Sequence, residues 1–193
     1  IYNPVPKANK SVDLYPFSNQ GSINLLFVGR LIAQKNVKLL IEIVSSYNLK
    51  NKFKINLDIY GEGDLKSELV NYSESLNASN YINFKGYCSN DKIPYSSYEA
   101  LLLTSYYEGF PNVLLEALSN NTKVIAQNIK CGPSEIIIHQ ENGWLVKSTN
   151  IADWHSGIDW LKNNKNCQEK ILIPDYLSDQ SVINNFKTLL NAE

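Results

Sequence analysis

Residues 100–118 read ALLLTSYYEGFPNVLLEAL and place a strand, a turn and a helix in direct succession. Residues 100–104 are a mostly apolar run without alternation, which is typical of a strand buried on both faces. Gly109 and Pro111 mark the turn that follows. Pro111 suits the first turn of a helix, because the N–H that it lacks would have no helical acceptor there. We therefore predict a strand at 100–104 that leads through this turn into a helix at 111–118.

The same strand-to-helix step recurs on both sides of this stretch. Further strands are predicted at residues 23–28, 54–60, 81–84, 123–126 and 144–146. Further helices are predicted at residues 36–49, 64–76, 151–161 and 178–190, and another opens at Gly132-Pro133-Ser134-Glu135. Asn36 is the predicted N-cap of the first helix. Alternating strands and helices predict a Rossmann-like three-layer α/β domain, whose parallel sheet is covered by helices on both faces.

Length and composition limit the classes of function. Residues 1–21, which are polar and hold three prolines, are assigned to a linker arm, and residues 22–193 to one domain. The formal net charge is -1, so no basic field predicts nucleic acid or an acidic membrane as a partner. The apolar runs are too short to span a bilayer, and no secretory signal is visible. Because the first residue is Ile1, we expect a fragment or a processed chain.

The cysteines predict neither a disulfide framework nor a metal site. Cys88, Cys131 and Cys167 are odd in number and form no C-x-x-C pair. We therefore expect free thiols in a reducing cytosol and no structural zinc.

Three polar clusters fall where predicted strands end. They are Gly29-Arg30 with Lys35, Gly61-Glu62-Gly63, and residues 108–112. Parallel strands bring such ends to one edge of the sheet, where doubly wound folds bind ligands. The planar donors of Arg30 and the point charge of Lys35 together suit a diphosphate. The alternative is a pair of solvated surface cations.

The segment from Glu108 to Glu116 carries the most information about a ligand. Phe110 and Pro111 lead into the predicted helix, whose first-turn N–H groups at Asn112, Val113 and Leu114 can attract phosphate. Gly109 lets a ligand approach the backbone closely. A carboxylate repels phosphate but accepts hydrogen bonds from the hydroxyls of a sugar or ribose. The order along the segment is then hydroxyl, phosphate, hydroxyl, although an ordinary helix with two solvated glutamates remains the alternative.

The chain resembles the C-terminal domain of family 4 glycosyltransferases, which have the GT-B fold, along nearly its whole length. The similar segments are Tyr2-Asn3-Pro4-Val5, 27–31, 34–36, 59–63, 84–87, 104–118, 132–137 and 142–146. Asn120-Asn121-Thr122 stands where the family often has a glycine that ends the helix, and asparagine also tolerates the left-handed conformation.

The resemblance implies retaining transfer of a hexose-type sugar from a nucleotide diphosphate sugar, a UDP-sugar, without a bound metal. It implies that Arg30 and Lys35 stabilise the leaving diphosphate and that Glu108 holds hydroxyls of the donor sugar. Glu116 would hold the ribose diol. The loop at Tyr87 and Cys88 would contact the base. Gly29 belongs to the phosphate loop.

The acceptor would be a glycan or a lipid-linked sugar, held by an N-terminal domain that this sequence does not contain. We expect a cytoplasmic location, with peripheral association of the whole protein at the inner face of the membrane left open. Two alternatives stay open. One is a nucleotide-sugar-binding module that is inactive without a partner acceptor domain, and the other is a GT-B epimerase, which should carry a different acidic segment.

The remaining residues that could carry chemistry are expected to have no catalytic role. His139 and His155 lie on or near helical stretches without a partner at metal-ligand spacing, so surface or helix-end histidines are expected. The three tryptophans are expected to be packing residues rather than platforms on which a sugar stacks. Ser105 lies in no Gly-x-Ser-x-Gly motif, so hydrolase chemistry has no support.

Overall fold

The computed structural model describes residues 21–148, 150–164 and 171–177 and the single positions 181, 184 and 187. Three predicted features therefore lie outside the described residues. They are the linker arm (of which only Gly21 is described), Cys167, and most of the helix predicted at 178–190. That 22–193 forms one domain stays a prediction.

Six parallel strands form one sheet in the order β3-β2-β1-β4-β5-β6. The strands are β1 (Ser22–Val28), β2 (Lys54–Tyr60), β3 (Ile82–Gly86), β4 (Ala100–Leu103), β5 (Lys123–Gln127) and β6 (Gly143–Val146). The helices are α1 (Val37–Lys50), α2 (Lys66–Ser75), α3 (Asn112–Ser119), α4 (Pro133–Ile136) and α5 (Ile151–Asn163). Short 3-10 helices are η1 (Ala33–Lys35), η2 (Asn90–Lys92), η3 (Tyr95–Ser97) and η4 (Asp175–Leu177). The predicted α/β class and the parallel sheet are confirmed.

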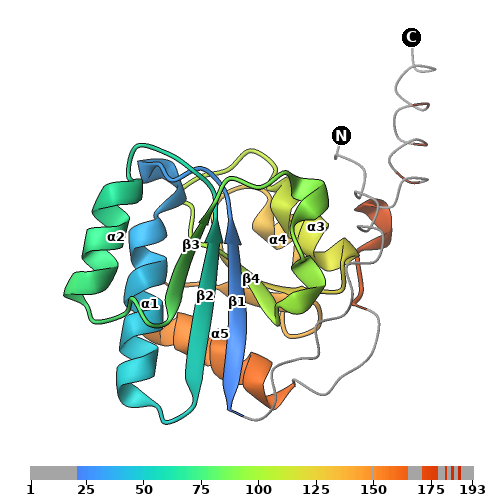
Figure 1. The fold of residues 1–193 in the computed structure, drawn as a ribbon. Coiled ribbons are helices and arrows are strands. Elements are labelled where there is room, and N and C mark those ends of the chain that lie inside the picture. Colours follow the sequence, from blue (N-terminus) through green and yellow to red (C-terminus); the bar gives the residue numbers. More distant parts are fainter. Residues whose placement is uncertain are drawn as a thin grey trace.

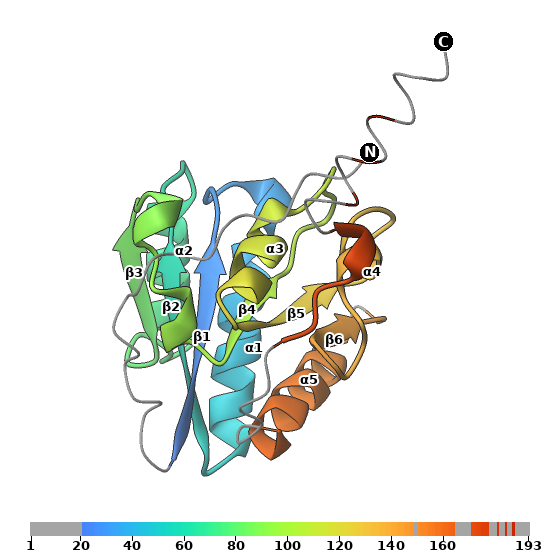
Figure 2. The same cartoon turned by 90° about the vertical axis from the view of Figure 1, so that its right-hand side faces the viewer.

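Helices lie on both sides of the sheet, as Figures 1 and 2 show from directions 90° apart, and two apolar clusters fill the space between them and the sheet. One cluster joins the sheet to α1, α2 and α5 and contains Trp154, which is fully buried. The other joins β4 and β5 to α3, α4 and η3. The chain switches from the first face to the second in the β3–β4 connection, because β1 lies between β2 and β4. This switch is where doubly wound folds open a crevice at the carboxyl ends of their strands.

The predicted flanking of the sheet by helices is confirmed, and the least covered part of the sheet is one face of its β2–β3 edge. Burial alternates along β2, so Ile55, Leu57 and Ile59 are buried while Asn56 and Asp58 are only half-buried. Only the short η2 and η3 connect β3 to β4, and three-residue turns cannot cover a sheet face as a full helix does. The strand sequence KINLDIY already carries this alternation, which is typical of a strand with one covered face.

Two local predictions concern asparagine. Asn36 is the N-cap of α1, as predicted, but its backbone is left-handed (φ 47°) and its side chain makes no capping hydrogen bond. Its left-handed backbone instead joins η1 to α1. Asn121 adopts φ 58° after α3, as predicted for a residue replacing a helix-ending glycine.

Candidate functional site

The loop after β1 runs along the carboxyl edge of the sheet, where Figure 1 shows the arrowheads of β1 and β2. Gly61 and Gly63, after β2, pack against it so closely that a Cβ on Gly61 would lie 1.9 Å from the carbonyl oxygen of Gly29. A Cβ on Gly63 would lie 2.4 Å from the carbonyl oxygen of Leu31, and both glycines have positive φ. The Gly-Glu-Gly motif is therefore needed to bring the two loops together.

Lys35 and Glu108, which are 73 residues apart in the sequence, meet at this edge. Lys35 Nζ lies 2.6 Å from Glu108 Oε1, and the two side chains are 16% and 10% exposed. Lys35 also passes over Gly29, where its Cε is 3.7 Å from the position of a Cβ. The structure thus places a predicted phosphate-binding cation beside a predicted sugar-binding carboxylate.

Backbone and amide hydrogen bonds hold these two loops in register. The Gln34 side chain donates to the Tyr107 carbonyl (2.9 Å), and the Tyr106 N–H donates to the Gln34 carbonyl (3.0 Å). The Thr104 hydroxyl donates to the Lys35 carbonyl at 2.9 Å. Sequence reasoning missed Gln34 as a contact between the loops, because no local pattern pairs segments so distant in the chain.

Arg30 lies on the same loop but is exposed, and it forms no ion pair with any residue that the structure describes. Its guanidinium is therefore available to a ligand, which the sequence prediction requires. Gly109 is similarly open: a Cβ there would meet nothing within 4 Å, so the packing of the chain does not itself require glycine at this position.

The N-terminus of α3 offers fewer free donors than predicted. The Asn112 N–H donates to the Phe110 carbonyl and the Leu114 N–H to the Pro111 carbonyl, each at 3.0 Å. Only the Val113 N–H of the predicted three has no acceptor among the described residues. The expectation that all three were free is wrong, because tight turns close the first turn of the helix on itself.

Glu116 lies on α3 and accepts two hydrogen bonds from the β3–β4 connection. Asn90 Nδ2 donates to its Oε1 (2.9 Å) and the Tyr95 hydroxyl to its Oε2 (2.7 Å). Tyr95 is buried, and burial first, then the Glu116 carboxylate, raises the pKa of its hydroxyl well above the ordinary range. Asn90 and Tyr95 were missed by sequence reasoning, since residues 85–99 carried no predicted element and Tyr95 is 21 residues from Glu116 in the sequence.

The predicted base-contacting loop lies close to this carboxylate. Tyr87 is 79% exposed, whereas Cys88 is partly buried against the second apolar cluster and contributes to the raised pKa of Tyr95. Cys88 and Cys131 are free thiols, as predicted. The residues of the candidate site thus form two groups, Lys35 with Glu108 and Glu116 with its two donors, at the two ends of the segment that holds α3.

The other singled-out residues serve packing. His139 Nδ1 accepts from the Leu145 N–H (3.1 Å), and its ring packs against Trp144. Burial lowers the pKa of His155, which contacts the Ser46 hydroxyl and the Ile43 carbonyl. Among the described residues, no three His, Cys, Asp or Glu side chains are grouped as metal ligands. Within the same part of the chain, no helix combines the length and apolarity needed to span a bilayer.

The sequence profile of the family described as Glycosyl transferases group 1 matches residues 16–172, most of the chain. The chain belongs to this family. It is 29% identical over 173 residues to the poly(ribitol-phosphate) alpha-N-acetylglucosaminyltransferase of Staphylococcus aureus (strain COL). That match covers 86% of this chain but only 34% of the relative, so the chain spans about a third of the length of this relative.

Solved structures agree with this assignment. A Staphylococcus aureus TarM variant, solved with fondaparinux, alpha-GlcNAc-glycerol and UDP, has a TM-score of 0.69 and 28% identity over 79% of this chain and 31% of TarM. The C-terminal domain of the group 1 glycosyl transferase LpcC from Francisella tularensis shares the fold over 87% of both chains, with a TM-score of 0.64 and 22% identity. The domain of this group 1 glycosyl transferase therefore has the fold of a GT-B C-terminal domain.

Proposed function

We propose that this chain is the donor-binding domain of a retaining glycosyltransferase, which transfers a hexose-type sugar from a UDP-sugar to a glycan or lipid-linked acceptor. The Lys35–Glu108 pair at the carboxyl edge of the sheet carries the proposal. It sets a cation for the diphosphate directly beside a carboxylate for the sugar. The UDP in the TarM structure supports the choice of nucleotide.

Lys35 and Arg30 would act on the leaving group. As the bond from the sugar C1 to the diphosphate oxygen breaks, negative charge grows on the diphosphate. The Lys35 ammonium has three donors, of which Glu108 takes one, so two remain for phosphate oxygens. The exposed Arg30 and the Val113 N–H at the start of α3 add further donors. Positioned charges of this kind stabilise a transition state by several kcal/mol, or about 3 kcal/mol for one such donor.

Glu108 and Glu116 would hold hydroxyl groups on either side of the diphosphate. Glu108 is fixed by Lys35, and its second oxygen can accept from the donor sugar. Glu116 receives neutral donors from Asn90 and Tyr95 and retains lone pairs for the ribose diol. Tyr87, which is exposed on the neighbouring loop, would contact the base. The open space at Gly109 supports a close approach of the donor to the backbone.

Calorimetry with UDP tests this assignment. Glu116→Ala should weaken UDP binding by at least about tenfold, which is roughly 1.4 kcal/mol, because it removes the ribose acceptor. Glu74→Ala on α2 is the matched control, since Glu74 is exposed on the other face of the sheet and should leave UDP affinity unchanged. Equal affinity of Glu116→Ala and wild type would refute the ribose role.

We also propose that this chain needs an acceptor domain for turnover. The support is that the chain spans about a third of its Staphylococcus relative. The purified chain should therefore bind UDP yet transfer no radiolabelled sugar from UDP-N-acetylglucosamine or UDP-glucose to glycan or lipid acceptors. Transfer above the rate without protein would overturn the two-domain proposal and leave the donor site intact.

A further inference from the structure

Among the described residues, no helix longer than the η2 and η3 turns covers the polar face of the β1–β3 half of the sheet that lies opposite α1 and α2. Asn24, Asn56 and Asn83 lie on three neighbouring strands, and the register pairs Asn24 with Asn56 and Asp58 with Asn83. An uncovered sheet face in contact with water needs polar side chains, but it does not need amides aligned on adjacent strands. Contact with water therefore does not explain why these amides are aligned.

This face is hollowed into a cleft of about 530 Å³. The strands form its floor, and Pro94, Ser97 and Tyr98 of the β3–β4 connection form one wall. The volume lies in the range of roughly 300–1,000 Å³ that is typical of small-molecule sites. None of the lining residues is one that the proposed donor site uses, although the two sites are neighbours, since η3 contributes Tyr95 to the donor site and Ser97 to the cleft.

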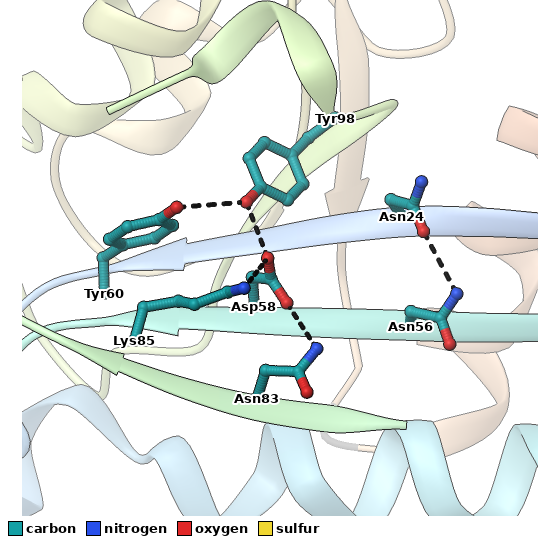
Figure 3. A network of polar contacts seen from close by, with 7 residues as sticks. All are labelled: Asn24, Asn56, Asp58, Tyr60, Asn83, Lys85 and Tyr98. Carbon is teal, nitrogen blue, oxygen red and sulfur yellow. Dashed lines mark hydrogen bonds and ion pairs between the residues drawn. The ribbon is translucent and has the colours of Figure 1, made fainter. Parts of the chain in front are cut away.

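The side chains of the cleft are already oriented by one another, as Figure 3 shows. Asn56 Nδ2 donates to Asn24 Oδ1 (3.1 Å), and Asn83 Nδ2 donates to Asp58 Oδ1 (2.7 Å). Buried Tyr98 donates its hydroxyl to Asp58 Oδ2 at 2.8 Å, which ties the wall to the floor. A ligand would therefore meet polar groups whose positions are fixed before it binds, which reduces the entropy that binding costs.

Hydrogen-bonding capacity is left over after these contacts. Each amide uses one atom, so Asn24 Nδ2, Asn56 Oδ1 and Asn83 Oδ1 have no partner among the described residues. The buried Ser97 hydroxyl in the wall has no hydrogen-bond partner either, and a buried hydroxyl without one is costly. The cleft thus presents both donors and acceptors that are unpaired.

The charges of the cleft cancel. Lys85 Nζ lies 3.3 Å from Asp58 Oδ2, and these are the two charged side chains among its lining residues. A strongly charged ligand would gain little attraction here, whereas a neutral molecule with many hydroxyls matches the mixture of amide donors and acceptors. The Tyr60 ring adds a flat amphipathic surface beside them.

From this juxtaposition we infer that the far face of the sheet binds a neutral oligosaccharide, at a site distinct from the donor site. The aligned amides hydrogen-bond vicinal hydroxyls, and the Ser97 hydroxyl gains a partner. Because the two sites share no residue, a nucleotide and an oligosaccharide can bind at once. This inference does not depend on the proposed donor function, so the failure of one would leave the other intact.

Titration of the isotope-labelled protein with chitotetraose and with maltotetraose, followed by NMR, tests the site. We expect saturable shifts of the Asn56 and Asn83 side-chain amides and of β2 and β3 backbone amides, with or without saturating UDP. Asn56→Ala combined with Asn83→Ala should weaken binding about tenfold, the effect of losing two ordinary hydrogen bonds. Asn71→Ala, on exposed α2 across the sheet, is the matched control.

Four results would overturn the inference: no saturable shift with either sugar, affinity unchanged in the double variant, displacement by UDP, or tighter binding of a sulfated tetrasaccharide. The single variant Asn83→Ala, at an exposed position, guards against misfolding of the double variant. Its affinity should fall about threefold, and no fall would count against the site.

Discussion

The two glutamates of the Glu-x7-Glu segment are held in opposite ways. Glu108 is nearly buried and forms an ion pair with Lys35 across two loops. Glu116 is half-buried and accepts hydrogen bonds from two neutral groups, Asn90 and Tyr95. Glu108 therefore has a cation beside it, whereas Glu116 has no cation within ion-pair distance among the described residues. Under the proposed function, both carboxylates would accept hydrogen bonds from hydroxyl groups, and only Glu108 would do so beside the cation that binds the diphosphate.

Among the substitutions that test this comparison, the largest effect is expected for one at Lys35. Lys35→Met should lower the free energy of unfolding by about 2 kcal/mol, because it leaves the Glu108 carboxylate 10% exposed and without a cation. Adding Glu108→Gln should restore roughly half of that loss, since the uncompensated charge is removed. Urea denaturation of the single and double variants measures both effects. A double variant no more stable than Lys35→Met would mean that the ion pair does not hold these loops.

A smaller effect is expected for a substitution of Tyr95, one of the two neutral donors to Glu116. Tyr95→Phe should cost about 1 kcal/mol of stability and weaken UDP binding about three- to fivefold, because Glu116 loses one of its two orienting donors. Tyr72→Phe is a close control: the Tyr72 hydroxyl donates to Glu42 at 2.7 Å, away from the site. It should lose comparable stability without any change in UDP affinity by calorimetry. If both variants weaken UDP equally, the effect of Tyr95 is not local.

The smallest effect is a pH dependence that sharpens the same comparison. The pKa of Tyr95 is raised in the folded protein, by burial first and by Glu116 second, so the folded state keeps a proton that the unfolded state releases. Stability contributed by this hydroxyl is therefore present below about pH 10 and lost as the pH rises further. Between about pH 9 and pH 11, wild type should lose stability more steeply than Tyr95→Phe. Parallel urea-midpoint curves for the two proteins would contradict this account.

Much of the fold could be predicted from local pattern. The strand predicted at 54–60 coincides with β2, and the helix predicted at 111–118 is displaced by one residue from α3. Apolar periodicity determines such elements because each residue's burial follows from its position in the repeat. The flanking of the sheet by helices was also predicted correctly. The thinner cover of the β2–β3 edge was not predicted, because no element was predicted for the β3–β4 connection, where only η2 and η3 form.

The candidate site could be predicted only in part. Its cations and carboxylates were visible as polar clusters at strand ends, and the Lys35–Glu108 contact follows from parallel strands bringing such ends together. The donors to Glu116 were not visible, since Asn90 and Tyr95 lie in a connection without a regular pattern. Three free N–H groups were predicted at the start of α3, but two of them donate to the carbonyls of Phe110 and Pro111 in a tight turn.

The sequence by itself determined the α/β class, the parallel sheet and the residue types at its carboxyl edge, because burial and turn formation are read from nearest neighbours along the chain. Only the tertiary structure decided which of those residues meet. Lys35 lies against Glu108, Tyr95 against Glu116 and Tyr98 against Asp58 because the order β3-β2-β1-β4 folds distant loops onto one edge and one face of the sheet. Contacts between residues tens of positions apart depend on the strand order and the crossovers, which no local stretch of sequence contains.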